Sequence, residues 1–300
     1  MQLNLFHYLF LASLAVFAST SCKQPEKPVY TYHNPYLDGP KELVEGEDYF
    51  LPHIDLSTWK VTLPIGRPTE ILPPEILDYA TNETLQPFMY NDSTDGSLVF
   101  YTYPGATTKN TSYSRTELRE LMDGGVGKVN WTFAQGGKMR ARLKLEEITQ
   151  DADDKYHRTI ILQIHGRLTD EQRALIGKDD NNAPPILKIY WANGRIRVKT
   201  KVLKDTTMQE PELLYTESWG DDDGVYFDEY VGFEPFTIEV IVSEGRMTVQ
   251  MNDDQMLVYE GIHIDKWSPF ENYFKAGNYL ASIDEGAFAK VKFYELEVSH

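Results

Sequence analysis

Short runs in which apolar and polar residues alternate recur along most of the chain, and turn residues separate them. Successive side chains of a β-strand point to opposite faces, so this period of two predicts half-buried strands. The clearest segments are GSLVFYTY (96–103), GKMRARLKLEEI (137–148), RTIILQIHGR (158–167), PILKIYWANGRIRVKTKVL (185–203), PFTIEVIVSEGRMTVQM (235–251) and AKVKFYELEV (289–298). Long amphipathic helices are nearly absent. We therefore predict an all-β fold, an antiparallel β-sandwich of the jelly-roll type.

Two turns and one helix can be placed within this pattern. Asn193-Gly194 is the strongest short hairpin signal in the chain, and the segment IVSEGRMTV (241–249) predicts a second hairpin. The segment LTDEQRALIG (168–177) predicts a short helix with Thr169 as its N-cap.

Two predicted strands carry a row of cations on one face and apolar residues on the other. The first row is Lys138, Arg140, Arg142 and Lys144, and the second is Arg195, Arg197, Lys199 and Lys201. Either row alone fits an ordinary solvated sheet surface. Two rows together indicate a segregated positive surface of the kind that a polyanion-binding cleft needs, and we select Arg195 and Arg197 as candidate substrate-binding residues.

The net charge limits the partners. The chain has 29 Lys and Arg against 46 Asp and Glu, a formal charge of −17. This argues against nucleic acid as a partner, although a local basic groove can still bind an anion. Tyrosine (19) outnumbers phenylalanine (14), which suits a surface that touches sugars and is also common in β proteins.

The N-terminal residues predict export. An apolar run over 9–18 is followed by small residues and Cys22, which indicates a lipoprotein-type signal peptide (1–21) with lipidation at Cys22. A conventional signal peptide with an incidental cysteine is the alternative. Residues 22–48, with four prolines among many charges, predict a tether to a single domain over 49–300. We expect a bacterial outer-membrane lipoprotein or an extracellular protein. Cys22 is the only cysteine, so the domain has no intrachain disulfide.

Three short segments carry the candidate chemistry. In SRTELRE (114–120), Arg115, Glu117 and Arg119 share a face, and Glu117 could hold both guanidinium groups in place. In LQIHG (162–166), Gln163 and His165 share a face on an otherwise apolar strand, and histidine is the usual general base near neutral pH. In YFKAGNYLAS (273–282), Tyr273, Lys275 and Tyr279 have matching parity if the strand continues across Gly277. Each segment alone also fits a salt-bridge ladder or a buried polar network.

The sequence lacks the motifs of several other kinds of active or binding site. The carboxylate spacing of a common jelly-roll glycosidase, clustered zinc ligands, a nucleophile elbow and a phosphate loop are not evident. WGDDDG (219–224) could hold calcium, but an acidic loop is the simpler interpretation. We expect neither a metal nor a cofactor.

The segments SRTELRE, QIH and YFKAGNY, in this order and at these separations, resemble the three signature blocks of the alginate lyases of polysaccharide lyase family seven. LSTWKVTLPIG (56–66) is similar to the opening strand of that family, and the likeness covers about 49–300. The resemblance implies a jelly roll with a cleft across its concave sheet. It also implies cleavage of alginate by β-elimination to give 4,5-unsaturated uronate ends. Ala281 stands where the family usually has Gln, which puts one substrate or supporting contact in doubt.

The resemblance also implies roles for individual residues. Arg115, Gln163, His165 and Tyr279 fall on catalytic positions, and Arg119 and Lys275 fall on substrate-contacting positions. With them we group Glu117 and Tyr273 as substrate-binding candidates. His165 would take H5 from guluronate while Tyr279 protonates O4. In mannuronate both atoms lie on one face of the ring, so Tyr279 could do both.

A tyrosine base requires a phenol pKa below its usual value of about 10. We expect Arg115 and Lys275 to lower the pKa of Tyr279, because nearby cations favour the phenolate. Within the resemblance, Ile164 of the QIH block, in place of Val, implies a guluronate-containing substrate.

Two alternatives remain open at this point: a lyase for another uronate polymer, such as a glucuronan or ulvan, and a non-catalytic carbohydrate-binding module. We expect a monomer that binds anionic polysaccharide and touches a membrane only through lipid on Cys22.

Overall fold

The computed structural model describes residues 52–300 except 93, 123–124 and 126. The predicted signal peptide (1–21), the lipidation residue Cys22 and the tether (22–48) lie outside the described residues. Within the described part, none of the helices combines the length and the apolar character that a membrane crossing requires.

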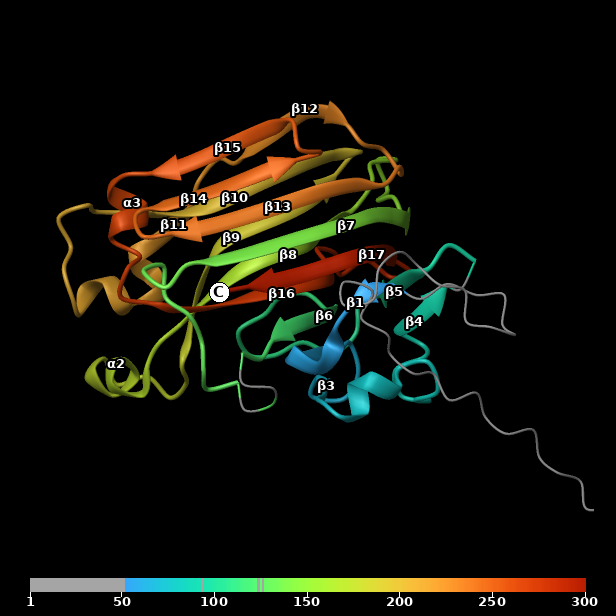
Figure 1. Ribbon diagram of the computed structural model, residues 1–300, viewed down its shortest axis with the longest axis horizontal. Coiled ribbons are helices and arrows are strands. Elements are labelled where there is room, and N and C mark those ends of the chain that lie inside the picture. The colour runs from blue at the N-terminus through green and yellow to red at the C-terminus, as the bar shows by residue number, and fades with distance from the viewer. Residues whose placement is uncertain (1–51, 93, 123–124, 126) are drawn as a thin grey trace, which may run out of the picture. The chain divides into compact units, whose positions relative to one another are not determined.

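Two β-sheets form the described domain, and Figure 1 shows them as two layers. The eight-stranded sheet consists, in spatial order, of β15 (Gln255–Glu260), β14 (Arg246–Met251), β13 (Phe236–Ser243), β7 (Gly137–Ile148), β17 (Ala289–Ser299), β5 (Ser97–Thr102) and β4 (Met89–Asp92), with β1 (His53–Ile54) also paired to β17. The nine-stranded sheet consists of β11 (Trp219–Asp221), β10 (Arg195–Leu203), β9 (Asn182–Ala192), β8 (Arg158–Arg167), β16 (Glu271–Leu280), β6 (Arg115–Glu120), β2 (Trp59–Leu63) and β3 (Thr69–Ile71), with β12 (Val225–Tyr230) also paired to β10. The pairing is antiparallel except between β1 and β17. The predicted all-β antiparallel sandwich is confirmed.

Helical segments are short. They are α2 (Asp170–Leu175), α3 (Ile262–Asp265) and the 3-10 turns η1 (Leu56–Thr58), η2 (Glu75–Asp78), η3 (Glu212–Leu214) and η4 (Thr216–Ser218). Helix α2 is the predicted helix. Thr169 caps it, and Gln172 completes a capping box by accepting from the Thr169 backbone N–H.

The predicted hairpins are also present. Asn193 and Gly194 both have positive φ, as a two-residue turn of type I′ requires, and they join β9 to β10. Gly245, with φ 68°, lies in the turn between β13 and β14.

The core lies between the two sheets and is filled by the apolar faces of the strands. On β16, Phe274, Ala276 and Leu280 are fully buried, whereas Tyr273 and Tyr279 lie on the other face and are partly exposed. The alternation that predicted the strands therefore separates a core face from an outer face on the nine-stranded sheet.

Strand β16 is central in this sheet, between β8 and β6, and it runs through Gly277 as expected. A Cβ at Gly277 would lie 2.7 Å from the Thr116 carbonyl oxygen and 2.9 Å from the Glu117 Cα. Its φ of 141° also disfavours other residues. The glycine thus allows close approach of the β6 backbone.

The two cationic rows lie on different sheets, which corrects the expectation of one segregated positive surface. The row on β7 belongs to the eight-stranded sheet, where Lys138 and Arg140 pair with Glu239 and Arg140 also pairs with Asp253. The row on β10 belongs to the nine-stranded sheet. The alternation within a strand does not show which sheet that strand joins, so the sequence could not reveal that the two rows lie on different sheets.

Candidate active site

A cleft of about 440 Å³ lies on the face of the nine-stranded sheet that is turned away from the core. Arg115, Gln163, His165 and Tyr279 all line it. They come from three adjacent strands, β6, β8 and β16, so pairing of these strands brings together segments that are far apart in the sequence.

The buried carboxylate of Glu117 lies at the centre of this group. It is 1% exposed and does not line the cleft. Its Oε1 accepts a hydrogen bond from Gln163 Nε2 at 2.5 Å, and its Oε2 pairs with Lys275 and lies 3.7 Å from Arg115 Nε. Glu117 therefore contacts three cleft residues but does not itself line the cleft, although the sequence had grouped it with the substrate-binding candidates.

Arg119 differs from the expectation that Glu117 would hold it. Its guanidinium donates to the carbonyls of Glu120 and Gly127 and to Asn130 Oδ1. These contacts fix the side chain at 8% exposure, and its carbon Cζ lies 4.1 Å from the centre of the Tyr273 ring. Arg119 thus lines the cleft with most of its donors already used.

His165 is held as a neutral imidazole. Its Nδ1 lies 2.9 Å from the Gly166 carbonyl, which can only accept, so Nδ1 carries the proton and Nε2 keeps a free lone pair. The ring stacks on Tyr273 at 5.2 Å between centres. Burial, with Lys275 and Arg115 nearby, lowers the pKa of His165 to about 3. The imidazole is therefore uncharged at neutral pH.

The pKa of Tyr279 is raised, whereas we expected nearby cations to lower it. Burial and the Glu117 carboxylate raise the pKa of Tyr279 to about 12, although Arg115, 5.6 Å from the ring centre, lowers it in part. The sequence could not predict this, because it gave no measure of burial and did not show that the Glu117 carboxylate acts on Tyr279 across the strands. Tyr279 is a protonated phenol at neutral pH.

Lys275 is a buried cation with an unusually low pKa. Burial lowers the pKa of Lys275 to about 8, and the paired Glu117 limits the fall. The ammonium is therefore mostly charged at neutral pH and loses its proton just above it. Ala281, the departure from the family pattern, also lines the cleft.

The structure does not bring Arg195 and Arg197 to the cleft. Both lie on β10 beside β12, where Arg195 donates to the Asp228 carbonyl and Arg197 to the Asp223 carbonyl. Neither side chain is among the lining residues.

Sequence reasoning missed other lining residues, chiefly Lys188 and Tyr190 on β9. The signal was available, because both alternate with the buried Leu187 and Ile189. Asp221 in the acidic loop accepts from Lys188, and Asp222 accepts from Thr200, so these carboxylates serve protein partners. Among the described residues, no cluster of three or more His, Cys, Asp or Glu is arranged to hold a metal ion.

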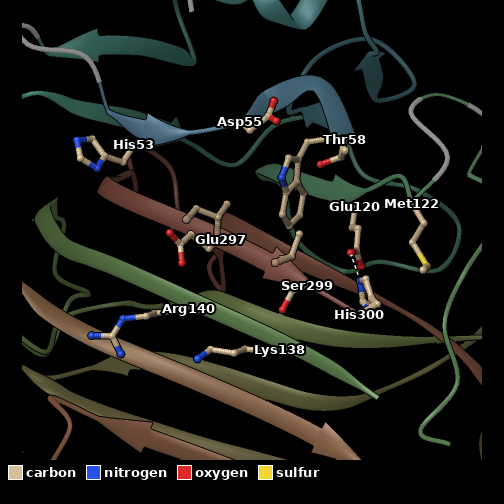
Figure 2. Close-up of a pocket in the computed structure, with 13 residues that line it drawn as sticks. His53, Asp55, Thr58, Glu120, Met122, Lys138, Arg140, Glu297, Ser299 and His300 are labelled. Atoms are coloured by element: carbon tan, nitrogen blue, oxygen red, sulfur yellow. Dashed lines mark hydrogen bonds and ion pairs between the residues drawn. The ribbon is translucent and has the colours of Figure 1, made fainter. Parts of the chain in front are cut away.

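A second cavity, of about 420 Å³, lies beside β1 and β17 and is shown in Figure 2. Its lining includes the pair formed by His300 Nε2 and Glu120 Oε1, 2.6 Å apart. Glu120 Oε2 also accepts from the Phe274 backbone N–H and the Trp131 indole, so this carboxylate secures the core side of β16. None of the candidate catalytic residues lines this cavity.

Comparisons with known proteins agree on one family. A family model described as "Alginate lyase" matches residues 54–300. Alginate lyase A1-II′, a member of polysaccharide lyase family 7, is 31% identical over 82% of this chain and 96% of its own, with a TM-score of 0.66. Variants of that enzyme have been solved with product (GGG) and with substrate (GGMG).

Two further solved structures extend the likeness. Alginate lyase AlgAT5, also from polysaccharide lyase family 7, is 25% identical over 82% of this chain and 95% of its own, with a TM-score of 0.59. The alginate lyase from Corynebacterium sp., 24% identical over 85% of this chain and all of its own, has a TM-score of 0.57 and supports the fold alone. A search of curated proteins found no significant match.

Proposed function

This chain belongs to the alginate lyase family, and on that premise we propose that it cleaves alginate by β-elimination at the 4-O-glycosidic bond. The products carry 4,5-unsaturated uronate ends. The observation that carries the proposal is the convergence of Arg115, Gln163, His165 and Tyr279 on one cleft. These side chains supply the donors, the base and the acid that an elimination from a uronate requires.

Arg115 and Gln163 bind the carboxylate of the reacting uronate. H5 is a weak acid while that carboxylate is ionised, and negative charge grows on it as the proton leaves. A guanidinium and an amide N–H aimed at the carboxylate stabilise this charge. Glu117 accepts from one position of the Gln163 amide, which fixes its orientation and leaves a second N–H for substrate.

His165 removes H5 through the free lone pair of Nε2. Its low pKa makes it a weak base in the empty cleft. Entry of an anionic uronate offsets the nearby cations Lys275 and Arg115, which raises the basicity of the imidazole when substrate is bound. Tyr273, stacked on the ring, keeps the imidazole in place.

Tyr279 donates its proton to O4, the leaving oxygen. A pKa of about 12 keeps the phenol protonated at neutral pH, which suits an acid better than a base. In guluronate, H5 and O4 lie on opposite faces of the ring, so His165 and Tyr279 each need to perform one transfer. We therefore propose that guluronate-containing regions are the preferred substrate, with Lys275 and Arg119 supplying further positive charge.

A panel of polymers tests this function. Wild-type protein is incubated with polyguluronate, polymannuronate, glucuronan and ulvan, and the ultraviolet absorbance of the unsaturated ends is followed. We expect product from both alginates, formed faster from polyguluronate. Product from glucuronan or ulvan alone would indicate a lyase for another uronate polymer. Binding of alginate without product would indicate a carbohydrate-binding module.

We also propose that the protein is exported and anchored through lipid on Cys22, with residues 1–21 as signal peptide, 22–48 as tether and 49–300 as a monomeric catalytic domain. The apolar run followed by cysteine supports this. In a bacterial host, wild type should incorporate labelled fatty acid and fractionate with membranes, whereas Cys22→Ala should do neither. Labelling of Cys22→Ala would contradict the assignment.

A further inference from the structure

The floor of the cleft continues beyond the residues given chemical roles, over β9 and β10. Lys188 and Lys201 line this part of the cleft, and their side chains are 13% and 14% exposed. Lys188 is the Cα partner of Gln163 on β8 and of Lys199 on β10. Paired residues on neighbouring strands share a face, so these lysines extend the same surface that carries Gln163.

One aspartate organises the lysines. Asp221, on β11, accepts from Lys188 Nζ and from Lys201 Nζ at 2.7 Å each, one on either carboxylate oxygen, and lies 4.0 Å from Lys199 Nζ. These cations lower the pKa of Asp221 to about 2 despite its partial burial. One negative charge thus faces three positive charges, and the cluster keeps a surplus of two.

We propose that Lys188 and Lys201, oriented by Asp221, form a distal subsite for the carboxylate of a second uronate residue of the same chain. The inference rests on the proposed function and adds to it a specificity determinant. Neighbouring strands are about 4.8 Å apart, close to the length of one 1,4-linked sugar residue. Lys188 and Lys201 lie one and two strands beyond Gln163, so the subsite would receive a uronate one to two residues from the reacting one.

A purely structural role for the three lysines, as partners of Asp221, explains their arrangement less well than a substrate subsite does. Neutralising Asp221 requires one lysine, whereas three converge on it, and two of them line the cleft. The lysines are partly buried, so solvent and salt screen their attraction for an anion less than they would at an open surface. Further towards β12, Arg195 and Arg197 lie outside the lining of the cleft and beside the exposed Asp223 and Asp228, so we end the positive track at the lysine cluster.

Chain-length-dependent kinetics test the subsite. Lys188→Met and Lys201→Met are compared with wild type on guluronate oligomers of increasing length. We expect KM to rise about tenfold on long substrates, the loss of one charge-assisted contact, with the smallest effect on the shortest oligomer cleaved. Lys188→Arg keeps the positive charge, so its KM should be close to the wild-type value. The matched control is Lys290→Met, which breaks a lysine–glutamate pair on the eight-stranded sheet and should leave kinetics unchanged.

The variant Asp221→Asn tests whether the lysines bind substrate or serve only to neutralise Asp221. It removes the negative charge and leaves the lysines, so KM for long oligomers should fall, opposite to the lysine variants. Lysine variants that leave KM unchanged, or that raise it equally at all lengths, would overturn the subsite. So would an Asp221→Asn variant that binds long oligomers as poorly as they do. Calorimetric titration of wild type and Lys188→Met with a guluronate oligomer tests the same difference even if no cleavage occurs, which keeps this inference separate from the proposed activity.

Discussion

At the residue scale, the site depends on Glu117, a buried carboxylate that does not line the cleft. Glu117 contacts Gln163, Lys275 and Arg115 from beneath the cleft floor. The sequence identified this residue by its place between two arginines, but it could not indicate that the lysine and the glutamine of other strands are its partners. Alternation gives the face of one strand, whereas partners across strands depend on register.

Replacing Glu117 by Gln should change the pH dependence of the reaction. The carboxylate raises the pKa of Lys275, which burial holds at about 8, so its removal should lower that pKa further. The alkaline fall of kcat/KM, which we place just above pH 8 in wild type, should then begin at a lower pH. A pH profile of kcat/KM on polyguluronate measures this shift. An unchanged alkaline limb would show that Lys275 does not control it.

Replacing His165 by Gln should make the fold less sensitive to acid. The pKa of His165 is about 3 in the folded protein and about 6.5 when unfolded, so between these values the unfolded chain binds the extra proton. Stability is therefore lost as pH falls from 6.5 towards 3, by up to about 3 kcal/mol at pH 4. The fall in Tm between pH 7 and pH 4 should be smaller in the variant. An equal fall in both proteins would contradict the low pKa.

At the element scale, β16 carries both the chemistry and the attachment of one sheet to the other. Asn278, fully buried, donates to the carbonyls of Phe100 on β5 and Ala289 on β17, and it accepts from Thr159 on β8. These bonds join the two sheets directly behind Tyr279. The segment's polar residues are thus of two kinds. The alternation separates them, because Asn278 shares its parity with the buried Phe274 and Leu280, but the sequence alone could not show which strands Asn278 joins.

Gly277→Ala should damage both stability and activity. The added Cβ would lie 2.7 Å from the Thr116 carbonyl oxygen and would oppose a φ of 141°. We expect a loss of about 2 kcal/mol or more, together with lower kcat, because β6 and β16 position Glu117 and Tyr279. Chemical denaturation and kinetics measure the two effects. Gly286→Ala is the control, since its φ is also positive but no atom lies within 4 Å of the added Cβ. Equal losses of stability and kcat in both variants would show that the close approach of β6 to Gly277 is not the cause.

The strands and hairpin turns could be predicted because each depends on the residue pattern within its own short segment. β7 and β8 begin and end where the alternation does, and the turns at Asn193-Gly194 and Gly245 follow from residues that tolerate positive φ. The segment containing η3, η4 and β11 could not, because its conformation depends on contacts with distant parts of the chain. One example is the edge-on contact of the Trp219 ring with the ring of Trp267, 4.9 Å between centres.

At the scale of the whole molecule, a chain of charge −17 concentrates its useful cations in one place. Lys275, Arg115, Lys188 and Lys201 line the cleft of the nine-stranded sheet, whereas the β7 row lies on the other sheet, where Lys138 and Arg140 pair with Glu239 and Asp253. Net charge therefore argues against nucleic acid as a partner without arguing against every polyanion. The sequence predicted a basic surface, and only the topology shows which cations contribute to it.

Tyr279 as the proton donor to O4 is the central claim of the proposed mechanism. The decisive measurement is the rate of formation of unsaturated ends from polyguluronate by Tyr279→Phe, with folding checked by Tm. The control is Tyr226→Phe, an exposed tyrosine on β12 outside the cleft. We predict that Tyr279→Phe keeps its fold and loses at least about 100-fold in rate, while Tyr226→Phe matches wild type. A folded Tyr279→Phe variant with wild-type rate would contradict the mechanism.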